Sequence, residues 1–212
     1  MKIAVMAGTP IDTKMGVSLL YKNDFNEILD IPISRNPSEQ TIFQVSNREY
    51  KEKIINNHID NIKEQNCNVL FVYCNSLSSS LDFNEIAKTK NIRIITPMDI
   101  YVEISKKYKK IGIISANAQG LAGIEKVMFQ TNENIEIVGI TLLEMVKEIE
   151  KCENVKKISE KFDFLTLIKY FNAMKVDAIV VGCTHFPYVK EEFKKLTNIE
   201  ILDPGIKMIE KI

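Results

Sequence analysis

The feature that most constrains this chain is an internal repeat of its apolar segments. Cys74 directly follows one apolar run, residues 68–73, and Cys183 follows a second, residues 177–182, with 109 positions between the two cysteines. Two more pairs of runs recur in the same order: residues 2–6 with 110–114 at an offset of 108, and residues 92–97 with 199–204 at an offset of 107. Three ordered pairs at nearly one offset predict a duplicated structural unit.

The alternation of short apolar runs with longer amphipathic stretches predicts an α/β fold. Strands separated by helices of about 10 to 15 residues indicate βαβ units and parallel sheets. Together with the repeat, this predicts two pseudo-symmetric lobes, each a parallel sheet flanked by helices, with residues 1–97 in the first lobe and 98–204 in the second. We expect residues 205–212 to pack back on the first lobe. The expected strands are residues 2–7, 28–33, 68–73, 92–96, 111–115, 135–140, 177–182 and 199–202.

Polar and glycine-containing stretches between these strands predict the connections. We expect a long helix over residues 47–65, with His58 as a surface or packing residue, and a helix over residues 142–150. Four other stretches are expected to be loops or turns: residues 8–16, 34–40, 116–120 and the serine-rich segment that follows Cys74.

Charge and hydropathy exclude several classes of function. Lysine plus arginine and aspartate plus glutamate both total 28, so no net field favours nucleic acid or an anionic membrane. No apolar run approaches the roughly 18 residues that cross a bilayer, and the first residues do not read as a signal peptide. We therefore expect a cytoplasmic protein that acts on a small molecule.

The cysteine spacing and the absence of nucleotide-binding motifs bear on cofactors. Four cysteines without paired spacing predict free thiols in a reducing compartment. The sequence has neither a Gly-x-Gly-x-x-Gly fingerprint nor a P-loop, and Cys183 and His185 alone do not make a zinc site. We expect neither a cofactor nor a metal.

The two strand-end cysteines predict a particular chemistry. Ligands of open α/β sheets bind at the carboxyl ends of strands, where Cys74 and Cys183 are expected to lie. If the lobes are related by an approximate twofold axis, the two thiols face each other across an interlobe cleft. One thiolate can then remove a proton from a tetrahedral carbon while the opposite thiol returns a proton to the other face. The configuration of the carbon would invert without a cofactor.

The repeat also fails at informative positions. Asp12 corresponds to Gly120, and His185 corresponds to Ser76, so each lobe carries an ionisable group that the other lacks. We expect Asp12 to assist Cys74 and His185 to assist Cys183. Short polar side chains beside the cysteines could hold an α-carboxylate: Thr13, Asn75, Ser76 and Thr184. Arg35 either grips a substrate carboxylate or is a solvated loop residue.

These residues resemble a known family. Cys74-Asn75-Ser76 and the segment from Gly182 to Pro187, Gly-Cys-Thr-His-Phe-Pro, look like the two signature motifs of the aspartate/glutamate racemase superfamily, and the second is most similar to glutamate racemase. The resemblance implies a cofactor-independent racemase of two α/β lobes with both cysteines catalytic. It implies further that Asp12 matches the aspartate after the first strand, and that Glu150 is an assisting glutamate or else a solvated helix end.

The chain departs from the family at its substrate-binding loops. The glycine-rich loop of the family reads Asp-Thr-Lys-Met-Gly over residues 12–16, and its Pro-Tyr-Gly loop is absent where residues 36–40 stand. Asn117 and Gln119 replace threonines of the second lobe, which makes Asn117 a candidate substrate contact. These departures affect the expected substrate more than the expected reaction.

The hypothesis that follows is racemisation of glutamate or a closely related acidic amino acid by a homodimeric enzyme. The alternatives are an aspartate or broad-specificity racemase, or another two-cysteine enzyme of the superfamily such as a maleate isomerase or hydantoin racemase. An alternative of a different class is a bilobal binding module for an acidic amino acid, which does not account for two cysteines at equivalent strand ends.

Overall fold

The computed structural model describes residues 1–212 and divides the chain into two compact units. Unit 1 comprises Met1–Asp99 and Gly205–Ile212, and unit 2 comprises Ile100–Pro204. The chain therefore returns to unit 1 at its carboxyl end. There Arg93 Nη1 donates to the backbone carbonyl of Ile212 at 3.0 Å.

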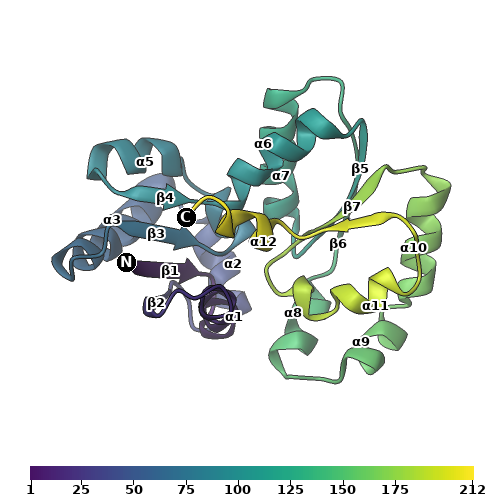
Figure 1. The fold of residues 1–212 in the computed structure, drawn as a ribbon, viewed down its shortest axis with the longest axis horizontal. Coiled ribbons are helices and arrows are strands. Elements are labelled where there is room, and N and C mark those ends of the chain that lie inside the picture. Colours follow the sequence, from purple (N-terminus) through teal and green to yellow (C-terminus); the bar gives the residue numbers. More distant parts are fainter. The chain divides into compact units, whose positions relative to one another are not determined.

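Unit 1 alternates strands and helices along the chain (Figure 1). Its elements are β1 (Lys2–Ala7), α1 (Pro10–Tyr21), β2 (Glu27–Pro32), α2 (Pro37–Val45), α3 (Arg48–Glu64), β3 (Val69–Val72), α4 (Asn75–Ser78), α5 (Phe83–Lys90), β4 (Arg93–Ile95), the start of α6 (Pro97–Lys107) and most of α12 (Pro204–Ile209).

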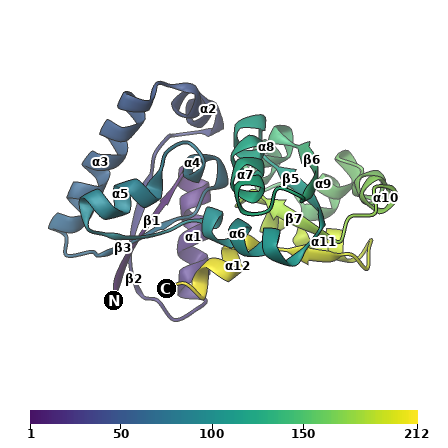
Figure 2. The same cartoon turned by 90° about the horizontal axis from the view of Figure 1, so that it is seen from above.

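The four strands of unit 1 form a parallel sheet in the order β2-β1-β3-β4, with apolar side chains on both faces. Helices α3 and α5 lie along one face (Figure 2) and bury their apolar stripes against it. The other face meets α1, where a Cβ on Gly16 would come within 2.9 Å of Val5 and Tyr73 side chains. Successive strand residues point to opposite faces, so the β-branched runs of β1 and β3 serve both layers. The buried cluster on the α3 and α5 side includes Ala4, Met6, Ile55, Ile59, Ile62, Leu70, Val72, Phe83 and Ile86.

Unit 2 repeats this plan with β5 to β8. Its elements are the remainder of α6, then β5 (Lys110–Ser115), α7 (Ala118–Thr131), β6 (Glu136–Thr141), α8 (Leu143–Glu150), α9 (Val155–Lys161), α10 (Phe164–Ala173), β7 (Ala178–Gly182), the 3-10 turn η1 (Phe186–Tyr188), α11 (Lys190–Lys194) and β8 (Glu200–Leu202).

The packing of unit 2 depends on glycines in its two central strands. A Cβ on Gly112 of β5 would lie 2.7 Å from the ring of Phe171 on α10. A Cβ on Gly182 of β7 would lie 3.0 Å from Ile113 and 3.2 Å from Ile124 on α7. Helices α7 and α10 therefore approach opposite faces of this sheet closely, because Gly112 and Ile113 are neighbours on β5 and point to opposite sides.

The two sheets confirm the predicted α/β fold and its internal repeat. The second sheet has the order β6-β5-β7-β8, which is the order of the first with each strand replaced by its counterpart. The registers also correspond: Lys2 pairs with Glu27 between β1 and β2, and Lys110 pairs with Glu136 between β5 and β6. All strand pairs are parallel.

The expected loop over residues 8–16 is wrong, because α1 begins at Pro10. Thr9 is its N-cap, and Thr9 Oγ1 accepts a hydrogen bond from the backbone N–H of Asp12 at 3.2 Å. The expected loop over residues 116–120 is wrong for the same reason. Asn117 caps α7, and its Oδ1 accepts from the N–H of Gly120 at 2.9 Å. Both short polar residues satisfy backbone donors of the first turn.

Two further expectations of irregular structure are also wrong. Residues 37–40 belong to α2, which Asn36 caps by accepting from the N–H of Glu39 at 3.0 Å, with Pro37 at the first helical position. The serine-rich segment after Cys74 contains the one-turn helix α4. Helix α9, in which only Ile158 is buried, was not expected from the sequence.

Candidate active site

Both cysteines lie immediately beyond the carboxyl end of a central strand. Strand β3 is followed by Tyr73 and then by Cys74, which is the N-cap residue of α4. Cys183 directly follows β7. Their exposed fractions are 3% and 6%. Both are free thiols. The two cysteines thus occupy equivalent places in the two sheets.

The sulfur of Cys74 accepts a hydrogen bond from a side-chain amide. Gln40 Nε2, on the first turns of α2, donates to Cys74 Sγ at 3.1 Å and also to Ser76 Oγ at 3.2 Å. Gln44, one helical turn further along α2, donates its Nε2 to the same Ser76 Oγ at 2.7 Å. The hydroxyl of Ser76 lies 3.5 Å from Cys74 Sγ.

Asp12 and Thr13 lie in the first turn of α1, beyond the end of the neighbouring strand β1. Asp12 is 1% exposed, and its Oδ2 accepts from the backbone N–H of Gly8 at 3.2 Å. The hydroxyl of Thr13 donates to the carbonyl of Thr9 at 2.8 Å. Since the ends of adjacent parallel strands lie at one edge of a sheet, Asp12 and Cys74 belong to the same edge of unit 1. Asn75, which follows Cys74 in the chain, is also buried.

In unit 2, a histidine lies between the cysteine and a glutamate and contacts both. Cys183 Sγ lies 3.6 Å from His185 Nδ1, and His185 Nε2 lies 3.0 Å from Glu150 Oε1 at the end of α8. An ionised carboxylate only accepts hydrogen bonds, so Glu150 favours the proton on Nε2 of the neutral ring and leaves Nδ1 to accept from the thiol. The arrangement can move a proton between sulfur and imidazole.

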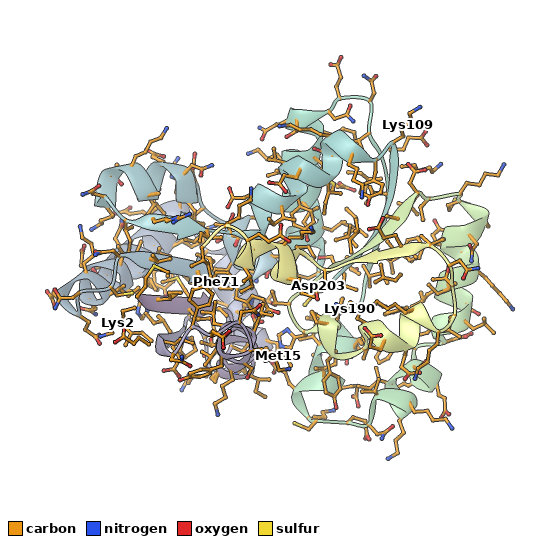
Figure 3. The ribbon with its side chains drawn as sticks, in the orientation of Figure 1. Lys2, Met15, Phe71, Lys109, Lys190 and Asp203 are labelled. Atoms are coloured by element: carbon orange, nitrogen blue, oxygen red, sulfur yellow. The ribbon has the colours of Figure 1, made fainter.

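Two other buried polar residues bear on the surroundings of Cys183. Thr184 is buried next to it. Tyr101 of α6 is fully buried, and its pKa is raised well above the usual value, first by burial and then by the charges of Cys183 and Asp203. Asp203 forms an ion pair with Lys190 at 2.9 Å, and both are labelled in Figure 3. Tyr101 therefore stays a neutral phenol near the thiol.

The remaining candidates lie in less specific surroundings. The Arg35 side chain is 88% exposed and forms an ion pair with Glu39 of α2, which also supports the reading of a solvated arginine. Asn117 has its side-chain oxygen engaged in capping α7. The structure thus brings Gln40, Ser76 and Cys74 together in unit 1, and Glu150, His185 and Cys183 together in unit 2.

Gln40 and Gln44 were not among the site residues predicted from the sequence. A signal for them was present, since Asn36, Pro37 and Glu39 form an N-cap, a first-turn proline and an acidic third position, which together indicate a helix start. A helix from this point places Gln40 and Gln44 on one face. The contact between this face and Cys74 depends on tertiary packing, which no local sequence pattern indicates.

No group of three or more histidine, cysteine, aspartate or glutamate side chains is arranged to hold a metal ion. None of the helices combines the length and the apolarity that a membrane span requires. Every buried side-chain nitrogen and oxygen has a hydrogen-bond partner within the protein.

Fold and site together define a class: duplicated α/β proteins that carry one thiol at the equivalent strand end of each half. No family model matches the chain. Glutamate racemase of Clostridium botulinum is 29% identical over 161 residues, which are 71% of this chain and 60% of that enzyme. Glutamate racemase of Fusobacterium nucleatum is 25% identical over 171 residues, 76% of this chain and 61% of that enzyme. The matches therefore span about three fifths of the length of these relatives.

A solved structure extends the similarity over the whole chain. Glutamate racemase of Francisella tularensis, solved in complex with D-glutamate, matches 99% of this chain and 78% of its own with a TM-score of 0.77 at 20% identity. The chain is therefore similar in sequence to glutamate racemases, and it shares the fold of the solved Francisella tularensis enzyme.

Proposed function

We propose that this chain is a cofactor-independent amino-acid racemase that interconverts L- and D-glutamate. The observation that carries the proposal is the pair of thiols, Cys74 and Cys183, at equivalent strand ends of a duplicated fold. The two relatives described above are both glutamate racemases, and the Francisella tularensis enzyme was solved with D-glutamate. A binding module for an acidic amino acid has no use for a second thiol in the equivalent place.

In the proposed reaction the two cysteines act on opposite faces of the substrate Cα. One thiolate takes the α-proton and becomes a thiol, while the opposite thiol gives its proton to the other face and becomes a thiolate. Each turnover therefore exchanges the protonation states of the two sulfurs and leaves the total number of bound protons unchanged. The titration of the two thiols is coupled, so apparent pKa values belong to the pair.

The neighbours of each sulfur suit these roles. His185, oriented by Glu150, can take the proton of Cys183 or return it. Asp12 lies at the sheet edge that carries Cys74, and we propose that it assists there. Thr13, Asn75, Ser76, Thr184 and Asn117 are proposed to surround the substrate, and the proposal gives Arg35 no part in the chemistry.

The experiment that tests the proposal incubates the purified chain with each enantiomer of glutamate, and separately of aspartate, in deuterated water. Proton NMR follows loss of the Cα signal, and chiral chromatography follows inversion. We expect both with glutamate, without added cofactor. Binding of glutamate without deuterium incorporation would contradict the proposal and favour the binding module. Faster inversion of aspartate would correct the substrate.

The proposal includes a homodimer and a cytoplasmic location, as expected from the sequence. Light scattering after size-exclusion chromatography measures the mass of the assembly directly. A mass of one chain, 24.3 kDa, at assay concentration would remove the dimer from the proposal.

A further inference from the structure

We propose that Gln40 is a positioning residue that, through Ser76 and by direct contact, holds Cys74 as a thiolate. The catalytic meaning of this inference rests on the proposed racemase activity. The contact itself is a property of unit 1. It goes beyond the resemblance to the racemases, whose Pro-Tyr-Gly loop is absent from this stretch of the chain.

The first support is the hydrogen-bond geometry of the Gln40 amide. Its Nε2 lies 3.1 Å from Cys74 Sγ and 3.2 Å from Ser76 Oγ, so each of its two hydrogens has an acceptor. A hydrogen-bond donor directed at sulfur stabilises the charged form of the group over its neutral form. Hydrogen bonds to ionised groups are also shorter and stronger than those between neutral groups.

The second support is the state of the Ser76 hydroxyl. Its oxygen accepts from Gln40 at 3.2 Å and from Gln44 at 2.7 Å, and these two bonds occupy both of its lone pairs. Its own hydrogen is then left to point elsewhere, and Cys74 Sγ lies 3.5 Å away. Cys74 Sγ thus faces two donors, one from an amide and one from a hydroxyl.

The third support is the internal repeat. Ser76 and His185 occupy equivalent positions, two residues after their cysteines. Helices α2 and α8 are also equivalent, since each follows the edge strand that pairs with the first strand of its sheet. Gln40 of α2 contacts Ser76, and Glu150 of α8 contacts His185 at 3.0 Å. In both units, a helix side chain therefore contacts the residue two positions after the cysteine, and that residue lies near the sulfur. The contacting groups are neutral in unit 1 and titratable in unit 2.

The backbone near Cys74 makes room for this amide. A Cβ on Gly8 would lie between 2.0 and 2.4 Å from the three terminal heavy atoms of the Gln40 side chain. Any other residue at position 8 would displace the amide. Gly8 also donates its N–H to Asp12 Oδ2, so one glycine serves both groups.

Charged groups near this site act differently from Gln40. Asp12 lies at the same sheet edge, and a carboxylate disfavours a neighbouring thiolate. Glu39, the residue before Gln40, is paired with Arg35 at 2.6 Å. The neutral amide and hydroxyl therefore supply donors whose charge does not change with pH.

The test measures the pH midpoint for ionisation of Cys74 in Gln40→Met and Gln40→Glu without any amino acid present. Methionine keeps the length of the side chain and removes the donor, and glutamate replaces the donor with a negative charge. The thiolate is followed by alkylation with iodoacetamide, resolved by peptide mass spectrometry. A second readout is the ultraviolet absorbance of the thiolate, taken as the difference from Cys74→Ala. The exposed Cys152 reports the reactivity of the reagent in every sample.

We expect Gln40→Met to raise the midpoint by roughly one pH unit, because a hydrogen bond to a charged group is worth about that much. Gln40→Glu should raise it further. The matched control is Gln65→Met at the exposed end of α3, which should leave the midpoint unchanged. Ser76→Ala should give a smaller rise and serves as the second variant if Gln40→Met does not fold. In the racemase assay, raising the pH should restore kcat to Gln40→Met.

An unchanged midpoint in folded Gln40→Met and in Ser76→Ala would overturn the inference, whatever the enzyme turns over. Racemisation of glutamate with such an unchanged midpoint would leave the proposed function standing and remove only Gln40. A shifted midpoint in a protein that incorporates no deuterium at Cα would keep the contact and remove the proposed function.

Discussion

Cys74 and Cys183 occupy equivalent positions, yet their neighbours differ in kind. Cys74 faces neutral donors from Gln40 and Ser76, whereas Cys183 faces an imidazole that a carboxylate orients. In the proposed reaction, the substrate carbon presents unlike faces to the two thiols, and the unlike neighbours of Cys74 and Cys183 suit that asymmetry.

Glu150→Gln tests the titratable side of this difference. The variant keeps the length of the side chain but loses the negative charge that orients His185, so we expect kcat to fall by roughly tenfold to a hundredfold. The control is Glu148→Gln on the same helix, since Glu148 pairs with Lys151 and Lys161 and does not contact His185. Initial rates in both directions give the comparison.

The same assay on His185→Asn and Asp12→Asn compares the two directions of reaction. The two enantiomers have equal free energy in water, so the ratio of kcat/KM values in the two directions stays near one in every variant. We expect the change to appear as unequal kcat values and unequal primary deuterium isotope effects. Isotope effects that respond identically to both substitutions would remove the assignment of Asp12 to Cys74 and His185 to Cys183.

At the scale of elements, glycines in the central strands set how closely helices approach the sheets. Gly112→Ala would place a Cβ 2.7 Å from the buried ring of Phe171, and we expect overpacking to lower the free energy of unfolding by about 1–3 kcal/mol. The control is Gly139→Ala on β6, where the nearest group is the flexible end of Leu121 and the glycine is exposed. Equal losses in chemical denaturation would contradict this account.

A histidine on helix α3 should make the stability of the protein depend on pH. Burial lowers the pKa of His58 below 6.5 in the folded state. Below about pH 6.5 the unfolded chain therefore binds more protons than the folded chain, and stability falls as the pH drops from there toward the folded pKa. His58→Gln should flatten that decline between about pH 7.5 and about pH 5. Denaturation midpoints of the two proteins that run parallel over this range would contradict the prediction.

Strands were easier to predict from this sequence than helix starts. The runs at β1, β3, β5 and β7 are apolar without interruption because both faces of each sheet are covered, and such runs are visible locally. The starts of α1, α2 and α7 depend on single polar caps, which also occur in loops. Helix α9 buries only Ile158 and so shows no apolar stripe.

Some residues of the candidate site could be predicted from the sequence, and others could not. The cysteines and His185 were predictable because strand ends and an internal repeat are properties of the sequence. The contact of Gln40 with Cys74 was not, because it depends on where α2 packs against the end of β3. A contact that depends on side-chain length and on the position of a helix has no recognisable sequence motif.

At the scale of the whole molecule, the central claim is that one thiol from each unit is needed for inversion. Each unit is a four-stranded parallel sheet with a free cysteine just beyond the end of a central strand, and in the proposed reaction each of these two thiols serves one face of the substrate. Loss of either thiol should therefore stop inversion while both sheets remain folded.

The most direct test is racemisation by Cys74→Ala and by Cys183→Ala, with Cys152→Ala as the control for an exposed thiol. Inversion of L- and of D-glutamate is followed by circular dichroism of the amino acid, and the fold by far-ultraviolet circular dichroism. We predict that each active-site variant loses at least about a hundredfold in kcat, the usual contribution of a positioned acid or base, and that Cys152→Ala keeps its rate. Substantial racemisation by either folded Cys74→Ala or folded Cys183→Ala would contradict the two-thiol account.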